Sequence, residues 1–316
     1  MINGLDFEKP ILELESKLEE LRHLSSSGEL NIADEVSRLE TKRDKLLQQV
    51  YSKLTPWQKV QVARHQDRPH FSDYVQHLIE DFTELSGDRL FAEDAAIVGG
   101  LGRFRGRSIV VLGQEKGRDM ETRLKHNFGM PRPEGYRKSQ RLMCMAEKFQ
   151  LPLVTFIDTA GAHPGVDAEE RSQSEAIAKS IEVSSSLTVP VVTIVNGEGM
   201  SGGAIAIGVA NHIYMLEHSI YAVISPEGCA SILWRTGDKK QEAAAVQKLT
   251  AQDLKKFKII DGIIPEPLGG AHRDKKAMVE SVGKTLDKAL SQLSSLSGDQ
   301  ILKQRRDKFL AMGRAL

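Results

Sequence analysis

The chain has 316 residues, of which 40% are hydrophobic and 27% are charged, so it is neither disordered nor fibrous. The 43 Lys and Arg residues balance the 43 Asp and Glu residues, and no overall basic field favours nucleic acid or a membrane surface. Aromatic residues make up only 5% of the chain, which argues against a stacking surface for single-stranded nucleic acid.

The cysteines and the apolar runs bear on the cellular compartment. Only Cys144 and Cys229 are present, and no Cys/His group has the spacing of a zinc site, so we expect a reducing compartment and no metal in this chain. Residues 1–10 lack the apolar core of a signal peptide. No apolar run reaches the 18 or so residues of a membrane span. We therefore expect a cytoplasmic protein.

The first fifty residues carry apolar residues at helical spacing between charged ones. This pattern predicts an antiparallel helical hairpin, which either packs on its own domain or docks a partner. Shorter helices are expected over 57–64 and 74–85. The stripe consists of Ile11, Leu14, Leu18, Leu21, Ile32, Val36, Leu39, Leu46 and Val50.

From about residue 95 short apolar strands alternate with helices. This alternation predicts an α/β fold, with functional loops beyond the carboxyl ends of the strands. We expect strands over 96–100, 108–113, 151–158, 189–196, 212–216 and 221–224, and helices over 133–149, 169–185, 204–210 and 274–316.

The glycine-rich segment 197–203 fits two unrelated short motifs. Gly197, Gly199 and Gly202 follow the dinucleotide-binding pattern, with Glu217 about 20 residues further on. Gly199, Ser201 and Gly203 follow the nucleophile-elbow pattern of serine hydrolases, which would need an acid and a base such as Asp238 with His272 or His218. Both motifs place free N–H groups at a helix start, where negative oxygen binds. A glycine turn required only for packing is the third interpretation.

A second small-residue loop, 158–165, also follows a predicted buried strand and precedes a helix. Two such loops on adjacent strands could aim two backbone N–H groups at one oxygen. That arrangement is an oxyanion hole.

Longer strings of residues resemble one family over nearly the whole chain: the alpha subunits of bacterial-type acetyl-CoA carboxylase carboxyltransferase. The strings are Leu5–Pro10, Phe128–Pro131, Pro133–Lys138, Ile157–Thr159, Gly197–Gly203, Val223–Trp234 and Ile263–Arg273.

The resemblance implies a crotonase-like (ClpP/crotonase) ββα superhelix with an N-terminal helical hairpin extension. Residues 1–90 would form the extension, 91–273 the carboxyltransferase domain and 274–316 a C-terminal helical segment. It also implies transfer of a carboxyl group from carboxybiotin, on the biotin carboxyl carrier protein, to acetyl-CoA, giving malonyl-CoA for fatty-acid biosynthesis.

The same family implies partners. The chain would be active only with a beta subunit, in an α2β2 assembly whose zinc ribbon and most of whose acetyl-CoA site lie on beta. Biotin carboxylase completes the ATP-dependent complex. No membrane or nucleic-acid partner is expected.

The resemblance also implies the site residues. The N–H groups of Gly202 and Gly203 would hold the ureido oxygen of biotin as negative charge builds there, and Gly161 and Ala162 would line the same cavity. The biotin anion itself can take the acetyl proton, so no side-chain base is expected. Gly199 and Ser201 would contact substrate from the same loop.

Three cations are candidates for binding an anionic substrate. Arg171 resembles the family arginine near the transferred carboxylate; the alternative is a helix arginine paired with Glu175. Lys116 and Arg118 could hold an anionic substrate; the alternative is an exposed basic loop.

Two loops depart from the family pattern, with Ala160 and His163 in place of proline and tyrosine and Met200 in place of glycine. His163 would either pack or contact biotin, and the side chain of Met200 puts the backbone angles of the loop in question. Three hypotheses remain: a carboxyltransferase subunit, a serine hydrolase acting through Ser201, and a non-catalytic assembly protein whose hairpin is the functional part.

Overall fold

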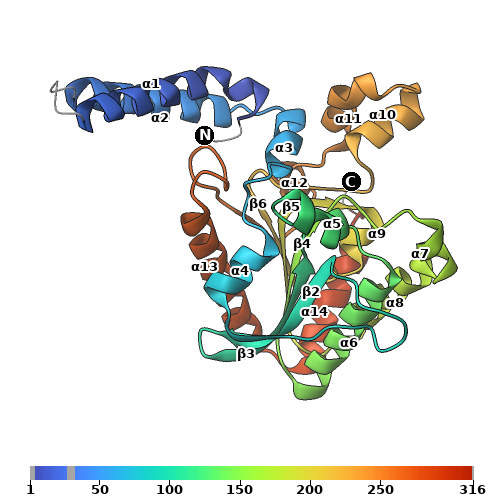
Figure 1. The fold of residues 1–316 in the computed structure, drawn as a ribbon. Helices are drawn as coiled ribbons and strands as arrows, with labels where there is room; N and C mark the ends of the chain where they lie inside the picture. The colour runs from blue at the N-terminus through green and yellow to red at the C-terminus, as the bar shows by residue number, and fades with distance from the viewer. Residues whose placement is uncertain (1–3, 27–32, 315–316) are drawn as a thin grey trace.

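The computed structural model describes residues 4–26 and 33–314. Its centre is one mixed sheet in the order β1-β2-β3-β4-β5-β6-β8, with β7 paired to β5 (Figure 1). The first three strands pair antiparallel and all later pairs are parallel. The strands are β1 Glu80–Glu84, β2 Ile97–Phe104, β3 Arg107–Gln114, β4 Leu153–Thr159, β5 Val191–Met200, β6 His212–Leu216, β7 Ile220–Ala222 and β8 Gly262–Ile264.

Helices cover both faces of the sheet, and each face has its own apolar core. On one face, α4 (Phe71–Leu78) and α13 (Lys275–Leu293) pack on the strands. On the other lie α6 (Pro133–Phe149), α9 (Ser201–Ile205) and α12 (Ala251–Lys256), with α8 (Gln173–Ser186) packed on α6 and α14 (Gly298–Ala311) packed on α8. Strands β4 and β5 are buried at every position, and most of their residues are apolar because both faces of the sheet are covered.

The predicted N-terminal hairpin is present as α1 (Lys9–Ser26) and α2 (Ala33–Tyr51), and it extends away from the sheet (Figure 1). Ile11 and Leu18 are buried as expected. On α2, however, Leu47 and Tyr51 are buried, whereas Leu46 and Val50 are only half buried. The apolar face is thus rotated by one residue from the predicted stripe, because α2 packs on Val62 of the following segment as well as on α1. Ile32 lies outside the described residues.

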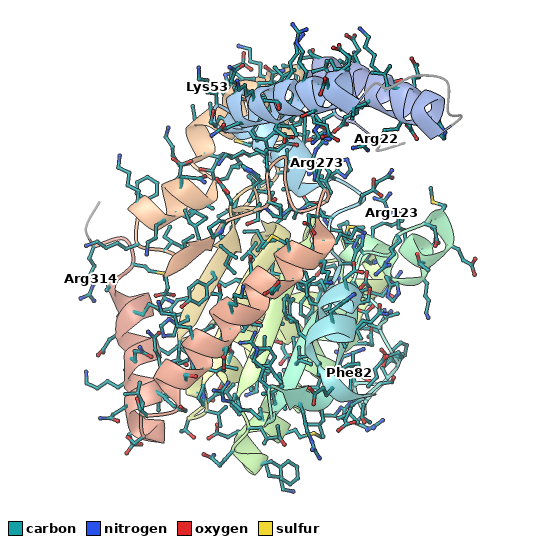
Figure 2. The ribbon with its side chains drawn as sticks, turned by 90° about the vertical axis from the view of Figure 1, so that its left-hand side faces the viewer. Arg22, Lys53, Phe82, Arg123, Arg273 and Arg314 are labelled. Atoms are coloured by element: carbon teal, nitrogen blue, oxygen red, sulfur yellow. The ribbon has the colours of Figure 1, made fainter. Side chains whose placement is uncertain are left out.

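One end of the hairpin is fixed to the rest of the molecule by buried charge. Arg273 contacts Glu8 at 3.0 Å and Glu15 at 2.5 Å, and the Tyr51 hydroxyl donates to Glu8 at 2.9 Å. Figure 2 shows Arg273 directly beneath the hairpin. The hairpin therefore packs on its own chain at this end.

Three expectations need correction. The predicted helix over 74–85 ends at Leu78, and the rest is β1, which pairs with β2. The predicted helix over 169–185 is two helices, α7 (Val166–Glu170) and α8, because Ser172 takes a left-handed φ of 66° between them. The segment 197–200 belongs to strand β5, and the helix after it spans 201–205 instead of 204–210.

The remaining helices are short and lie around the sheet. They are α3 (Pro56–Ala63), as predicted, and the unpredicted α5 (Met120–Lys125), α10 (Pro226–Trp234) and α11 (Lys240–Gln247). Among the described residues, no helix has the length and apolar character needed to cross a membrane. The division into three domains stays a prediction.

Candidate functional site

The site begins where strand β5 turns into helix α9. Ser201 makes this turn with a left-handed φ of 52°, a strained conformation that non-glycine residues rarely adopt. The N–H groups of the first helical residues have no acceptor within the helix. Met200 stays in extended geometry, and its side chain is buried against Val60 and Ile220, so it does not disturb the turn.

Helix α9 packs against the loop that follows β4 at very close range. A Cβ on Gly203 would lie 2.6 Å from the carbonyl carbon of Gly161 and 2.8 Å from the nitrogen of Ala162. Only a glycine permits this approach. The predicted set Gly203, Gly161 and Ala162 is therefore brought together by the fold. The N–H of Gly161 donates to the Thr159 hydroxyl at 3.0 Å, so Gly161 shapes the loop.

A cavity of about 720 Å³ opens at the same turn, and Ser201 and Gly202 are part of its wall. Most of the lining is apolar, including Ile205, Tyr221 and Phe309. Gly203, Gly161 and Ala162 are absent from the described lining, as is Gly199, which is buried within β5 beneath Tyr221. The predicted contact of Gly199 with substrate thus has no support from its position.

A buried network of charges lies beside the two loops. The Lys116 ammonium contacts the Asp158 carboxylate at 2.7 Å and the Glu198 carboxylate at 2.9 Å. Arg64, which follows α3, donates to Glu198 at 2.7 Å and to Glu227 of α10 at 2.7 Å. Burial raises the pKa of Glu198, but the nearby charges of Lys116 and Arg64 outweigh it and lower the pKa to about 2.

This network corrects the role considered for Lys116. Its side chain is 14% exposed, so the exposed basic loop is wrong for this residue. Two carboxylates already neutralise its charge, so Lys116 is not a free cation for an anionic substrate. Lys116 and Ala160 line a separate cleft of about 240 Å³.

The other two predicted cations are also paired. Arg118 contacts Asp73 of α4 and lines a groove beside α4. Arg171 contacts Glu134 at 2.8 Å and Asp167 at 3.3 Å, so the predicted pairing with Glu175 is wrong. The packing of α6 on α8 brings Glu134, at the start of α6, next to Arg171, which lies just before α8. Sequence spacing carried no signal of that contact.

Within the described part of the chain, no catalytic triad is assembled at Ser201. The cavity that Ser201 lines has no histidine or carboxylate in its described wall. His272 stacks on His65 with ring centroids 4.0 Å apart, and His218 packs against Tyr51. The Asp238 carboxylate accepts a hydrogen bond from the Thr236 hydroxyl, two residues before it in the chain. The dinucleotide interpretation fails as well, because Gly197 and Gly199 lie inside a strand.

His163 makes polar contacts within the protein. Its ring nitrogens lie 3.1 Å from the Asn127 amide and 3.4 Å from the Asp167 carboxylate. The described residues contain no group of three or more His, Cys, Asp or Glu side chains that could hold a metal ion.

Comparisons with known proteins agree on one family. A model of the acetyl co-enzyme A carboxylase carboxyltransferase-like family matches residues 4–313. The acetyl-coenzyme A carboxylase carboxyl transferase subunit alpha of Paramagnetospirillum magneticum is 62% identical over 311 residues, which cover 98% of each chain. The corresponding subunit of Rhizobium rhizogenes is 59% identical over 317 residues, which cover 100% of each chain.

Solved structures are similar in fold at low sequence identity. Transcarboxylase 12S superposes with a TM-score of 0.59 at 19% identity, covering 72% of this chain and 42% of that one. A Pseudomonas malonate decarboxylase hetero-tetramer in complex with coenzyme A superposes with a TM-score of 0.57 at 16% identity, covering 70% of this chain and 86% of that one.

The fold is crotonase-like, as the resemblance implied, and the family match makes the chain a protein of the carboxyltransferase class. The chain belongs to the family of acetyl-CoA carboxylase carboxyltransferase alpha subunits, and its reaction produces malonyl-CoA. This membership implies carboxybiotin and an acyl-CoA as substrates, and a complex with other subunits of acetyl-CoA carboxylase.

Proposed function

We propose that the backbone N–H groups of Gly202 and Gly203 form the oxyanion hole for the ureido oxygen of carboxybiotin. The observation that carries this proposal is the contact of Gly203 with the Gly161–Ala162 loop, where a Cβ would fall 2.6 Å from backbone. Donors fixed by such packing need no reorganisation when charge develops, and this preorganisation is the source of their catalytic effect.

The cavity at this turn suits the ring of biotin. It has about 720 Å³ of space and mainly apolar walls, with Ser201 and Gly202 supplying the polar edge. Apolar walls with a few placed polar groups are typical of small-molecule sites. Bound carboxybiotin supplies the carboxyl group, and the N–H groups of this chain stabilise the negative charge left on the ureido oxygen. The biotin anion would take the acetyl proton, and the resulting thioester enolate would take up the released CO2 to give malonyl-CoA, so the proposal needs no side-chain base.

Arg171 is absent from the described wall of this cavity, so its position gives no support to a contact with the transferred carboxylate, which stays a proposal. Its guanidinium lies 4.8 Å from the ring of Phe91, and its charge is shared with Glu134 and Asp167. To bind the transferred carboxylate it would have to exchange Asp167, the more exposed of these partners. A guanidinium fork matches a carboxylate well enough to make that exchange possible.

The chain acts with partners in this proposal: a beta subunit in an α2β2 assembly that carries the zinc ribbon, the biotin carboxyl carrier protein and biotin carboxylase, all in the cytoplasm. Exposed apolar side chains near the cavity support a docking surface for beta. Val223 is 82% exposed, Ile232 72% and Leu233 61%, and a cluster of this kind on a soluble domain is typical of an interface.

The decisive experiment measures malonyl-CoA-dependent carboxylation of free biotin by the purified chain, with and without the beta subunit. The chain alone should be inactive, because the thioester side of the site is missing. Measurable transfer by the isolated chain would overturn the two-subunit proposal. A fluorophosphonate probe tests the hydrolase alternative, since only an activated Ser201 would be labelled.

A further inference from the structure

Gln114, the last residue of β3, lies beneath both loops of the proposed oxyanion hole. It is 1% exposed. Its side-chain amide donates from Nε2 to the carbonyl oxygen of Gly203 at 2.9 Å, and its Oε1 accepts from the backbone N–H of Asp158 at 3.1 Å. One buried side chain therefore connects the end of β4 to the first turn of α9.

Strand β4 and strand β5, which leads into α9, are out of register at this point. Ile157 pairs with Val195, but Thr159 pairs with Gly199, so β5 has two more residues than β4 across the shift. The Asp158 carboxylate fills this irregularity. It accepts the N–H of Glu198 at 3.0 Å, and a Cβ on Gly197 would lie 2.2 Å from its oxygen.

The register shift is what carries the turn at Ser201 past the end of β4, opposite the Gly161–Ala162 loop. Strand pairing no longer holds the two segments in register here, and side chains take over that task. Lys116 and Asp158 supply the charged part of the link, and Gln114 supplies the part that reaches α9 itself.

We propose that Gln114 is a positioning residue for carboxyl transfer: it sets the distance between the β4 loop and α9, and thereby aims the N–H groups of Gly202 and Gly203. This proposal rests on the oxyanion hole proposed above. In this proposal Gln114 acts through its hydrogen bonds to Gly203 and Asp158, and its own side chain is absent from the described wall of the cavity at Ser201.

Glutamine suits this position because one side chain must both donate and accept. Methionine has a similar shape but would leave the buried Gly203 carbonyl and the buried Asp158 N–H without their partner, which is unfavourable for both groups. A glutamate could accept from Asp158 but donate to Gly203 only when protonated. Its charged neighbours are Asp158 of β4, Glu198 of β5, Lys116 after β3 and Arg64 after α3.

The test uses the complex of this chain with the beta subunit, assayed for malonyl-CoA-dependent carboxylation of biotin. Gln114→Met should lower kcat about 10- to 100-fold, the effect of small misplacements at an active site, with KM for malonyl-CoA changed less than twofold. Gln114→Glu should lose kcat relative to wild type as the pH rises from 6 to 9, because deprotonation removes the donor. This pH profile would not arise from a merely structural role.

Thr155→Val is the matched control, because it removes a buried side-chain hydrogen bond of 2.7 Å to Thr193 between the same strands, away from the loops. Its kcat should stay within twofold of wild type at temperatures where circular dichroism shows all variants folded. Two results would overturn the positioning role: a kcat of Gln114→Met equal to that of this control, or a ratio of the kcat of Gln114→Glu to that of wild type that does not change with pH.

The Gly203→Ala variant separates this inference from the proposed oxyanion hole. If Gly203→Ala lowers kcat and the Gln114 variants do not, only the positioning role of Gln114 is wrong. If Gly203→Ala leaves kcat unchanged, both the proposed oxyanion hole and the positioning role of Gln114 are wrong.

Discussion

Replacing Gly203 by alanine should lower kcat by about 10²-fold or more. The new Cβ would lie 2.6 Å from Gly161 and 2.8 Å from Ala162, where ordinary contacts begin at 3.4 Å. Both neighbours are backbone atoms, so the loop and helix must separate by about 1 Å, a displacement that can cost about 10²-fold in rate. Loss of one oxyanion donor costs about 10²–10³-fold.

The helix itself tolerates alanine better than glycine, by about 1 kcal/mol, so a loss of activity would not reflect poor helix formation. The assay is malonyl-CoA-dependent carboxylation of biotin by the complex with beta. Gly237→Ala is the control, because its Cβ would meet nothing within 4 Å, and it should retain full kcat. A folded Gly203→Ala complex with kcat within threefold of that control would refute the close-packing explanation.

Three further changes have clear expectations. Ser201→Ala should lower kcat less than about tenfold, because no covalent bond to its hydroxyl forms, whereas a hydrolase would lose about 10⁴-fold or more; steady-state kinetics distinguishes the two. Gly197→Ala should destabilise the fold by about 1–3 kcal/mol, since its Cβ would lie 2.2 Å from Asp158 Oδ1; urea unfolding measures this, and unchanged stability would contradict the packing described. The lowered pKa of Glu198, about 2 against 4.5, means that its stabilising contribution is present above pH 4.5 and disappears as the pH falls toward 2. Urea unfolding of wild type and Glu198→Gln should therefore show a difference in unfolding free energy that shrinks by about 3 kcal/mol as the pH falls over that range. If the two proteins lost stability in parallel with falling pH, the pairing would be disproved.

Much of the fold follows from local pattern. The helix predicted over 133–149 and the strand predicted over 212–216 have those bounds in the structure, because strong apolar periodicity and proline at a helix start act within a few residues. The activity was predicted from long strings of residues that resemble one family, because such strings are more specific than six-residue motifs. The short motifs themselves misled: Gly197 and Gly199 look like a loop in the sequence but form part of strand β5.

The site depended on contacts that no local pattern contains. The sequence by itself determined that two small-residue loops follow buried strands, and that one precedes a helix with free N–H groups. Only the tertiary structure decided that Gly203 meets Gly161, that Lys116 is neutralised by Asp158 and Glu198, and that Gln114 joins the two loops. The partners in these contacts lie more than 40 residues apart in the chain. They meet because parallel strands bring their carboxyl ends to one edge of the sheet, and a register shift of β5 at Asp158 then decides which atoms face each other.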